Sequence, residues 1–437
     1  MTEEKALNTS LNGHIELNGV DLVDLCVKFG TPLFVFDEKR FIDNYRRFHK
    51  AFSENYPKVA VCYSVKTNNN LAILNRIREE EAYAEVASSL DLYAALKAGF
   101  SPKRIILDGL YKPEELLRNA VRSELLLINV ESFSELELLN QLAGEIGKRP
   151  TVGLRMSIYP RKFLNSEELY CNPLSRFGFP LEDGITVFKR ALTFENLNIR
   201  GIMIHPYWGI HEFLPMANRI LNELGIKFDF INFGGGFQKS VKKIGIPDLV
   251  KDVLRLKLGM RSNLDSPPKK ARAIEEAARL IAEEVRETFG NDDSTLVFEP
   301  GRYLVHDAGY LIVQAGVVKE AAGFKWVVVD GGTNLVSDYL ERRTILVANK
   351  ANEPASTITN VVGPLLYGRD FITVKQRLPE IKEGDFLVLS NVGAYTLSSS
   401  TQFLYPRPRA VLIKTNGEVR VVREKETYED VLRKDIV

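Results

Sequence analysis

The chain has 437 residues, of which 45% are apolar and 26% charged, a composition typical of a globular protein with a large buried core. Lysine and arginine (58) nearly balance aspartate and glutamate (57), so we expect neither nucleic acid nor a membrane surface as a partner. Three widely spaced cysteines without a CxxC motif, and a polar N-terminus without an apolar signal region, favour a cytoplasmic location.

Apolar runs of strand length alternate with helical patterns through the first two thirds of the chain. Eight such runs are predicted strands, at residues 59–66, 82–88, 104–109, 125–131, 151–158, 200–207, 228–235 and 295–301. Stretches with apolar residues at a helical spacing separate them, as in LAILNRIREEE. Nearly continuous apolar strands are buried on both faces, so this alternation predicts a (β/α)8 barrel. The alternative, an open doubly wound sheet, lacks the GxGxxG fingerprint after the first strand.

The pattern changes after residue 305, where β-rich runs such as KWVVVDGG, DFLVLSNVG and RAVLIKTNG follow one another without long helical patterns. These runs predict a mainly antiparallel β domain. The earlier segment TPLFVFD (31–37) looks like a strand that joins this domain before the chain enters the barrel. We therefore predict a barrel at 38–305 and a discontinuous β domain made of 1–37 and 306–437. The charged stretch 240–266 is longer than a usual connection and predicts an excursion near the barrel mouth.

The ends of the predicted strands carry polar residues that chemistry uses. Active sites of this fold lie where the strands end, and Lys66 ends the first strand, while His205 ends the sixth. The glycine triplet Gly234–Gly236 ends the seventh, and Glu299-Pro300-Gly301-Arg302 follows the eighth. Each feature alone has an ordinary structural explanation: a paired lysine, a satisfied core histidine, a tight turn or a salt-bridged loop. Their convergence on one rim favours a functional site.

Together these groups indicate pyridoxal phosphate. A lysine amine can form a Schiff base with an aldehyde cofactor, and a carboxylate can pair with a pyridinium nitrogen. Three glycines allow backbone N–H groups to approach a phosphate. The imidazole of His205 could stack on a ring, and Arg302 could reach a phosphate or a substrate carboxylate. We found no ligand spacing among the other histidines and predict no metal site.

Several motifs occur in an order that matches a known family: YSVKTN, EVASSLDLYAALKAG, SRFGF, NFGGGF, EPGR, VVVDGG and GAYTLSSSTQF. On these, the chain resembles the fold-type III pyridoxal-phosphate decarboxylases of diaminopimelate, ornithine and arginine, with an overall pattern most similar to diaminopimelate decarboxylase. The resemblance implies that Lys66 carries the internal aldimine, His205 stacks on the ring and Glu299 holds the pyridine nitrogen. It places Gly234, Gly235, Gly236, Gly301 and Tyr395 at the cofactor, with Arg302 near the phosphate or the substrate. It also implies a head-to-tail homodimer with shared active sites.

The carboxylate of Glu299 favours one reaction type. Protonating the pyridine nitrogen makes the cofactor a full electron sink, which suits loss of carbon dioxide through a quinonoid intermediate. The resembling alanine racemases place an arginine there. We therefore expect a decarboxylase of an amino acid, with a diamino acid as the substrate. The alternatives are an isomerase or racemase, a decarboxylation-linked transamination, and a noncatalytic regulator built on the same scaffold.

Two departures from the family concern the substrate. Where the family has a cysteine near Cα, the segment VVGPLLYGRDF has Leu366, which cannot donate a proton; Tyr367 either supplies this proton or merely packs. Where diaminopimelate decarboxylases have an arginine for the distal carboxylate, this chain has Asp338. Asp338 either receives a distal ammonium or is a solvated loop residue, and the nearby Arg342 is a candidate substitute for the missing arginine. A further departure is the aromatic segment Pro206-Tyr207-Trp208 in place of a small phosphate-binding turn.

Overall fold

A computed structural model describes residues 7–158, 176–205, 207–237, 272–290, 293–336 and 343–437. Of these, 45–237 and 272–301 form one compact unit, which we call the barrel unit. Residues 7–44 and 302–437 form a second one, the sheet unit. Across the described ranges, no helix is both long and apolar enough to cross a membrane. The predicted excursion at 240–266 lies outside the described residues.

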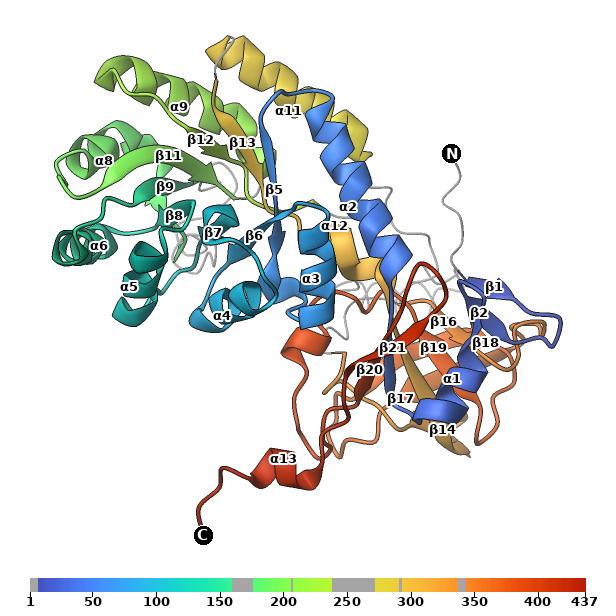
Figure 1. The fold of residues 1–437 in the computed structure, drawn as a ribbon. Helices are drawn as coiled ribbons and strands as arrows, with labels where there is room; N and C mark the ends of the chain where they lie inside the picture. The colour runs from blue at the N-terminus through green and yellow to red at the C-terminus, as the bar shows by residue number, and fades with distance from the viewer. Residues whose placement is uncertain (1–6, 159–175, 206, 238–271, 291–292, 337–342) are drawn as a thin grey trace. The chain divides into compact units, whose positions relative to one another are not determined.

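The barrel unit is built on parallel strands that close on themselves (Figure 1). The closing pair is β8 with β9, so the described strands form a complete ring and the predicted (β/α)8 barrel is confirmed. In ring order from the first, the strands are β5 (Val59–Ser64), β6 (Tyr83–Val86), β7 (Ile105–Leu107), β8 (Leu127–Val130), β9 (Thr151–Ser157), β11 (Asn198–Ile204), β12 (Phe230–Asn232) and β13 (Thr295–Phe298).

Helices lie on the outside of the ring (Figure 1). Their ends follow local rules: Asn70 accepts a hydrogen bond from the backbone N–H of Ala72 at the start of α3, and Ser88 and Ser132 cap α4 and α6 in the same way. The helices are α2 (Glu38–Ser53), α3 (Leu71–Glu79), α4 (Ser89–Lys97), α5 (Glu114–Ser123), α6 (Phe133–Ile146), α8 (Gly184–Ala191), α9 (Ile210–Leu224) and α11 (Ile274–Phe289).

A cluster of buried aromatic rings packs around the carboxyl ends of β12 and β13. The ring of Phe298, the last residue of β13, lies 3.9 Å from Phe52 and 5.5 Å from Phe233, measured between centroids. Phe237 meets Phe48 edge-on at 5.0 Å. Buried aromatic pairs of this kind contribute both apolar area and geometric preference. Phe233 and Phe237 flank the glycine triplet, so the cluster holds that turn against the strand that precedes Glu299.

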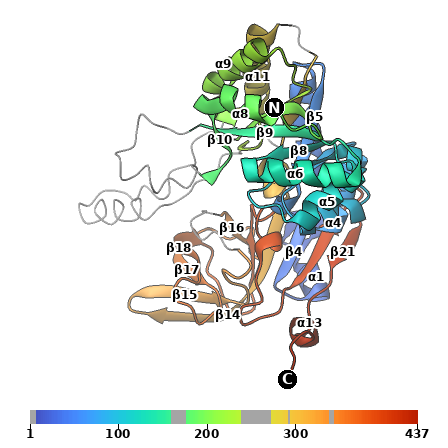
Figure 2. The same cartoon turned by 90° about the vertical axis from the view of Figure 1, so that its left-hand side faces the viewer.

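The sheet unit contains a mixed sheet. Its central strands are β4 (Leu33–Asp37) and β14 (Gly309–Ala321), and β4, formed by the TPLFVFD segment, lies between β14 and β20. Most pairings are antiparallel, as expected, but β4 with β20 and β15 with β17 are parallel. Figure 2 shows β15, β17 and β18 side by side. The further strands are β15 (Phe324–Val329), β16 (Ile345–Val347), β17 (Thr357–Val362), β18 (Phe371–Leu378), β19 (Phe386–Leu389), β20 (Arg409–Ile413) and β21 (Val419–Arg423).

Smaller elements complete the sheet unit. Apolar residues of β2, α1, β4 and β14 share one core, which includes Leu17, Leu22, Val35 and Ile312. The elements are β1 (Leu7–Thr9), β2 (Ile15–Leu17), β3 (Val20–Asp21), α1 (Leu22–Phe29), α12 (Arg302–Val305) and α13 (Tyr428–Leu432). The predicted domain boundaries at 37/38 and 305/306 stay a prediction.

Candidate active site

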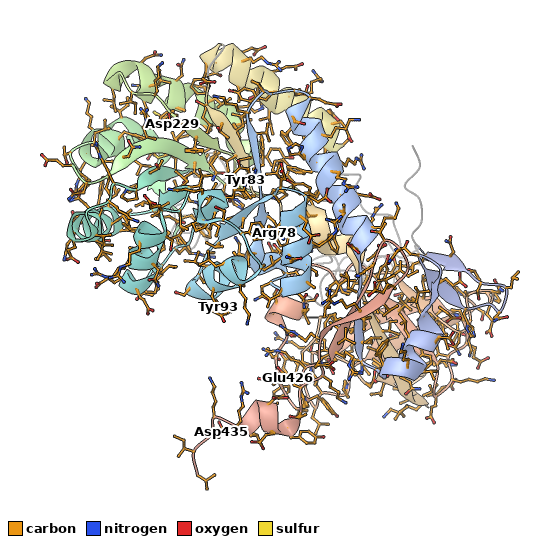
Figure 3. The ribbon with its side chains drawn as sticks, in the orientation of Figure 1. Arg78, Tyr83, Tyr93, Asp229, Glu426 and Asp435 are labelled. Carbon is orange, nitrogen blue, oxygen red and sulfur yellow. The ribbon has the colours of Figure 1, made fainter. Side chains whose placement is uncertain are left out.

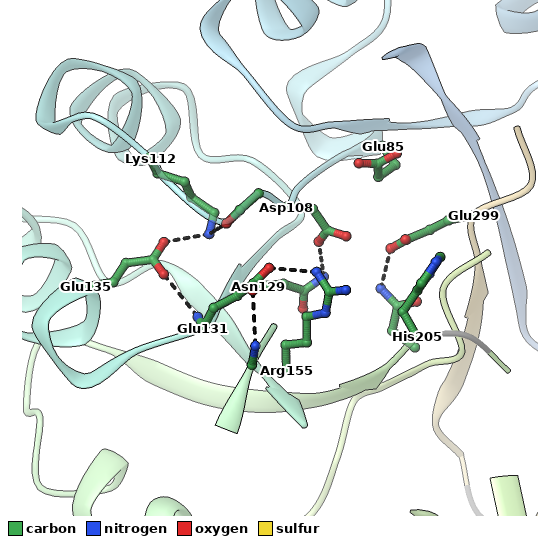
Figure 4. Close-up of polar contacts among 12 residues, drawn as sticks. Glu85, Asp108, Lys112, Asn129, Glu131, Glu135, Arg155, His205 and Glu299 are labelled. Carbon is green, nitrogen blue, oxygen red and sulfur yellow. Dashed lines mark hydrogen bonds and ion pairs between the residues drawn. The ribbon is translucent and has the colours of Figure 1, made fainter. Parts of the chain in front are cut away.

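Strand register brings polar side chains together at the carboxyl ends of the barrel strands. Ile106 of β7 belongs to the apolar core inside the barrel, and it pairs with Glu85 of β6. Because side chains alternate along a strand, Asp108, two residues beyond Ile106, also points inward. The same alternation from Val297 of β13, another member of that core, directs Glu299 inward. Figure 4 shows Glu85, Asp108 and Glu299 gathered at this end of the barrel.

Lys66 lies in a single 3-10 turn, Val65–Thr67, directly after β5. Its Nζ donates to both carboxylate oxygens of Glu85, at 2.7 and 2.6 Å, and the Ser64 hydroxyl donates to the same carboxylate at 2.5 Å. The Lys66 side chain is 48% exposed, whereas that of Glu85 is 1% exposed. A buried carboxylate therefore holds a lysine amine whose own surface stays accessible.

The side-chain amide of Asn232 holds the Glu299 carboxyl group in place. Asn232, the last residue of β12, donates from Nδ2 to Glu299 Oε1 at 2.6 Å, and its Oδ1 accepts the Gly234 backbone N–H at 2.8 Å. The Asn232 side chain is buried. One side chain thus sets both the orientation of the carboxyl group and the start of the glycine turn.

The glycine turn leaves space that side chains would fill. Gly234 has φ +61°, and a Cβ there would lie 2.5 Å from His205 Nδ1. A Cβ on Gly235 would lie 2.9 Å from the backbone oxygen of Glu299. The Gly235 N–H donates to His205 Nδ1 at 2.9 Å. In the neutral ring, this bond assigns the proton to Nε2. At Gly301, a Cβ would collide with the Thr67 hydroxyl, which explains a glycine in EPGR.

A second group of polar residues lies across the barrel mouth from the glycine turn. Asn129 of β8 donates to Asp108 Oδ1 at 2.6 Å. Arg155 of β9 donates from Nη1 to Glu131 Oε1 at 2.6 Å and packs its guanidinium 4.6 Å from the centre of the Phe177 ring. Figure 4 shows this group, with Lys112 and Glu135 continuing it through an ion pair of 2.6 Å.

The SRFGF motif is tied to the same arginine. The Gly178 N–H donates to Glu131 Oε2 at 3.1 Å, so Glu131 bridges Arg155 and the motif. Gly178 has φ +61°, and a Cβ there would lie 2.5 Å from the Arg155 backbone oxygen. Phe177 and Gly178 of the motif therefore pack around Arg155.

The buried carboxyls differ in protonation. Burial alone would raise the pKa of Glu85, but the charge and hydrogen bond of Lys66 lower it below its ordinary value. Burial, then the charges of Asp108 and Glu85, raise the pKa of Glu299 well above its usual range. Burial and the charge of Glu85 also raise the pKa of Asp108. The three pKa shifts therefore run in opposite directions: pairing with Lys66 favours the ionised form of Glu85, and burial together with the neighbouring carboxylates disfavours ionisation of Glu299 and Asp108.

His205 is neutral at physiological pH. Desolvation by burial, then the positive charges of Arg155 and Lys66, lowers the pKa of the His205 imidazole to about 4. The side chain remains accessible to solvent. The ring is thus surrounded by protein atoms although part of its surface meets solvent. An accessible, neutral ring beside the glycine turn could stack on a flat ligand.

The remaining predicted site residues lie in the sheet unit or outside the described residues. The Arg302 guanidinium lies 5.3 Å from the centre of the Tyr395 ring, and Tyr395 has φ +55°, uncommon for a residue other than glycine. Leu366 is 96% exposed and Tyr367 is about half exposed. Asp338 and Arg342 lie outside the described residues, as does Pro206.

Sequence reasoning missed Glu85, Asp108, Asn129, Arg155 and Asn232. Each lies inside or directly after a predicted strand, and all are buried. The sequence signal that could have identified these five residues is a polar residue within an otherwise apolar strand of the barrel. The inward direction follows only once the register is known, because alternation assigns each position to the interior or to the helices.

These groups are the types that pyridoxal phosphate needs. An accessible lysine amine (Lys66), a buried carboxyl with a raised pKa (Glu299) and an imidazole (His205) lie at the carboxyl ends of the barrel strands, beside the glycine turn. Backbone N–H groups of such turns bind phosphate oxygens in many proteins. Here the Gly234 N–H donates to Asn232 Oδ1 and the Gly235 N–H to His205 Nδ1, so the feature of this turn that suits a phosphate is the space left by the missing side chains. The donor set therefore fits an aldehyde cofactor with a ring nitrogen and a phosphate.

Comparisons with known proteins agree with this chemistry. The family model "Pyridoxal-dependent decarboxylase, pyridoxal binding domain" matches residues 42–306. A diaminopimelate decarboxylase of Methanothermobacter thermautotrophicus is 32% identical, with 96% of this chain and 95% of the relative covered. That of Bacillus subtilis is 30% identical, with 97% and 96% covered. The crystal structure of the M. jannaschii enzyme in complex with L-lysine is 29% identical, with a TM-score of 0.83 and 100% and 99% covered.

Proposed function

Because the chain belongs to the pyridoxal-dependent decarboxylases and is a pyridoxal-phosphate-dependent amino-acid decarboxylase, we propose that its substrate is a diamino acid of the diaminopimelate class. Relatives that match nearly the whole chain carry the name diaminopimelate decarboxylase. The observation that carries the proposal is a set of groups at the carboxyl ends of the barrel strands, which we call the site layer: the Lys66–Glu85 pair, the Asn232–Glu299 pair and the glycine turn.

Each residue of this layer has a physical task in the proposal. Pyridoxal phosphate supplies an aldehyde that binds amines covalently and a ring that stabilises negative charge when carbon dioxide leaves. Lys66 provides the amine, and Glu85 holds its Nζ at the end of β5. Glu299 faces a ring nitrogen in the proposal, and burial, followed by the charges of Asp108 and Glu85, raises the pKa of its carboxyl well above the ordinary value. The neutral His205 ring, oriented by Gly235, provides a flat stacking surface.

The residues proposed to bind the distal group of the substrate are assigned from their positions in the sequence. Asp338 occupies the position at which the resembling enzymes have an arginine. We propose that Arg342 binds a distal carboxylate of the substrate; the alternative is a distal ammonium bound by Asp338. From the resemblance, Tyr395 is proposed to serve the phosphate, and Arg302 the phosphate or the substrate; the Arg302 guanidinium lies 5.3 Å from the centre of the Tyr395 ring.

A substrate panel tests the proposal. Purified protein with added pyridoxal phosphate is given meso-diaminopimelate, lysine, ornithine or arginine, and carbon dioxide release is measured. We expect release from meso-diaminopimelate. Release only from lysine or ornithine would move the substrate to a diamino acid with a distal ammonium. Absence of release from all four would contradict the proposal.

We also propose that the protein is a head-to-tail homodimer in the cytoplasm. Helix α4 presents Leu90 and Tyr93, which are 63% and 62% exposed, and Tyr111 of the barrel unit is 80% exposed. Figure 3 labels Tyr93 on this helix. Exposed apolar side chains that gather on one element favour a protein partner. Sedimentation equilibrium should give twice the mass of the chain, and replacing Tyr93 and Tyr111 by serine should weaken the dimer.

The buried thiols of Cys26 and Cys62, which are free, suit a reducing compartment.

A further inference from the structure

Amino-acid decarboxylation consumes a proton. When the carboxyl group leaves as carbon dioxide, the electron pair of its bond stays on the substrate carbon, which must then take a proton. Leu366, at the position of the family's cysteine, has no proton to give. Tyr367 is half exposed and belongs to the sheet unit. The following inference rests on the proposed function and concerns where this proton is held.

Asp108 is one of the buried carboxyl groups of the candidate active site. It directly follows β7, its backbone N–H donates to the Val86 oxygen at 2.8 Å, and alternation directs its side chain into the barrel. Its side chain is buried, and Oδ1 accepts the Asn129 amide at 2.6 Å. Glu299 is held by Asn232 in the same way, also at 2.6 Å. The barrel mouth therefore contains two buried carboxyls, each oriented by an asparagine (Figure 4).

The local cations are already matched by other carboxylates. Lys66 pairs with Glu85, and Arg155 pairs with Glu131. A buried carboxylate without a cation of its own is costly, and two that lie near one another are more so. Protonation removes this cost. Burial and the charge of Glu85 raise the pKa of Asp108, in agreement with the geometry, although Arg155 acts in the opposite direction.

The other groups of the layer are less suited to give a proton. Glu85 is held ionised by Lys66 and Ser64. His205 is neutral, and its Nδ1 accepts the Gly235 N–H. Glu299 is assigned to the ring nitrogen in the proposed function. Asp108 remains as a buried acid with no other task, and its second oxygen, Oδ2, is free of the Asn129 bond.

We propose that Asp108 is a catalytic acid of this enzyme, which delivers a proton from its carboxyl group to the substrate carbon that has lost carbon dioxide. The Asp108 O–H bond breaks as the new C–H bond forms, and Asp108 is left as a carboxylate. Water returns a proton to the carboxylate before the next turnover. The net reaction consumes one proton and needs no oxidant or reductant.

The first test is Asp108→Asn, which keeps the shape and removes the acid. Positioned acids contribute about 10²- to 10⁴-fold, so amine formation should fall by that factor. Carbon dioxide released should exceed amine formed, because a proton placed on the cofactor instead of the substrate carbon would, after hydrolysis by water, give pyridoxamine phosphate and a carbonyl product in place of the amine. That product is measured separately by mass spectrometry. Equal carbon dioxide and amine at the wild-type rate would overturn the proposal.

Two controls distinguish a proton donor from a merely structural residue. Asp91 is another buried carboxyl of the barrel unit, whose Oδ2 accepts the Ala87 N–H at 3.1 Å, and Asp91→Asn should keep carbon dioxide and amine equal. Tyr367→Phe should also keep them equal. Unequal products from Tyr367→Phe, with equal products from Asp108→Asn, would assign the proton to Tyr367 instead.

Two further measurements do not depend on the asparagine variant. In Asp108→Ala, added acetic acid should restore amine formation in proportion to its protonated fraction, and lack of rescue would count against Asp108. In wild-type protein without cofactor, infrared spectroscopy should show protonated carboxyl groups at neutral pH. Their absence would overturn the proposal even if no substrate of the panel reacts, so its failure is distinguishable from failure of the proposed function.

Discussion

Gly235→Ala tests whether the glycine turn is a space kept open for a ligand. The added Cβ would lie 2.9 Å from the backbone oxygen of Glu299 and 3.2 Å from His205 Cε1. A backbone oxygen cannot rotate away, so the turn or the Glu299 strand end must move. Gly235 has no positive φ, and strain in its own backbone does not contribute. Overpacking of this kind costs about 1–3 kcal/mol. If the whole cost falls on the conformation that binds the cofactor, its Kd rises about 5- to 150-fold.

The assay is titration of cofactor-free protein with pyridoxal phosphate, followed by the absorbance of the bound form. Gly316→Ala is the matched control, because a Cβ on that glycine of β14 meets only the Val328 oxygen, at an ordinary 3.7 Å. We expect weaker cofactor binding in Gly235→Ala and unchanged binding in Gly316→Ala. Wild-type affinity in Gly235→Ala would refute the reasoning that this turn forms the cofactor cradle.

Three further predictions concern the same layer. The folded-state pKa of His205 is about 4, against an ordinary value of 6.5. The unfolded chain therefore binds the proton more readily, and the free energy of unfolding falls as the pH decreases from 6.5 towards 4. Urea unfolding across this range should show a smaller loss of stability in His205→Gln than in wild type. Asn232→Ala removes the bonds to Glu299 and Gly234, each worth about 0.5–1.5 kcal/mol, and should weaken cofactor binding together with thermal stability; unchanged values of both would contradict its role. Glu85→Gln removes the carboxylate that holds Lys66, so cofactor attachment should slow markedly, as measured by stopped-flow absorbance, and a wild-type rate would show that the pair does not position the amine.

The barrel could be predicted from the sequence because its strands are short apolar runs separated by helical spacing. The same reasoning located Lys66, His205, the glycine triplet and Glu299, since each ends a run and the ends of parallel strands share one rim. Asp108 was placed inside the predicted strand 104–109, whereas β7 ends at Leu107, so the rule that selected residues at the ends of runs did not select it.

Other features depend on information that the pattern does not contain. Glu85 lies inside a strand, and whether it faces the interior depends on its register with Ile106. Arg155 is predictable as a strand residue, but its pairing with Glu131 joins positions that are far apart in the chain. The parallel pairing of β4 with β20 joins the beginning of the chain to its last third. Periodicity within a segment cannot identify such partners.

The most direct test of the active-site assignment is to locate the covalent attachment of the cofactor. Protein loaded with pyridoxal phosphate is reduced with borohydride, digested and analysed by mass spectrometry. The account predicts a single reduced pyridoxyl group on Lys66, and none after the same treatment of Lys66→Ala. A group on another lysine, such as the buried Lys112 paired with Glu135, would contradict the assignment of the active site.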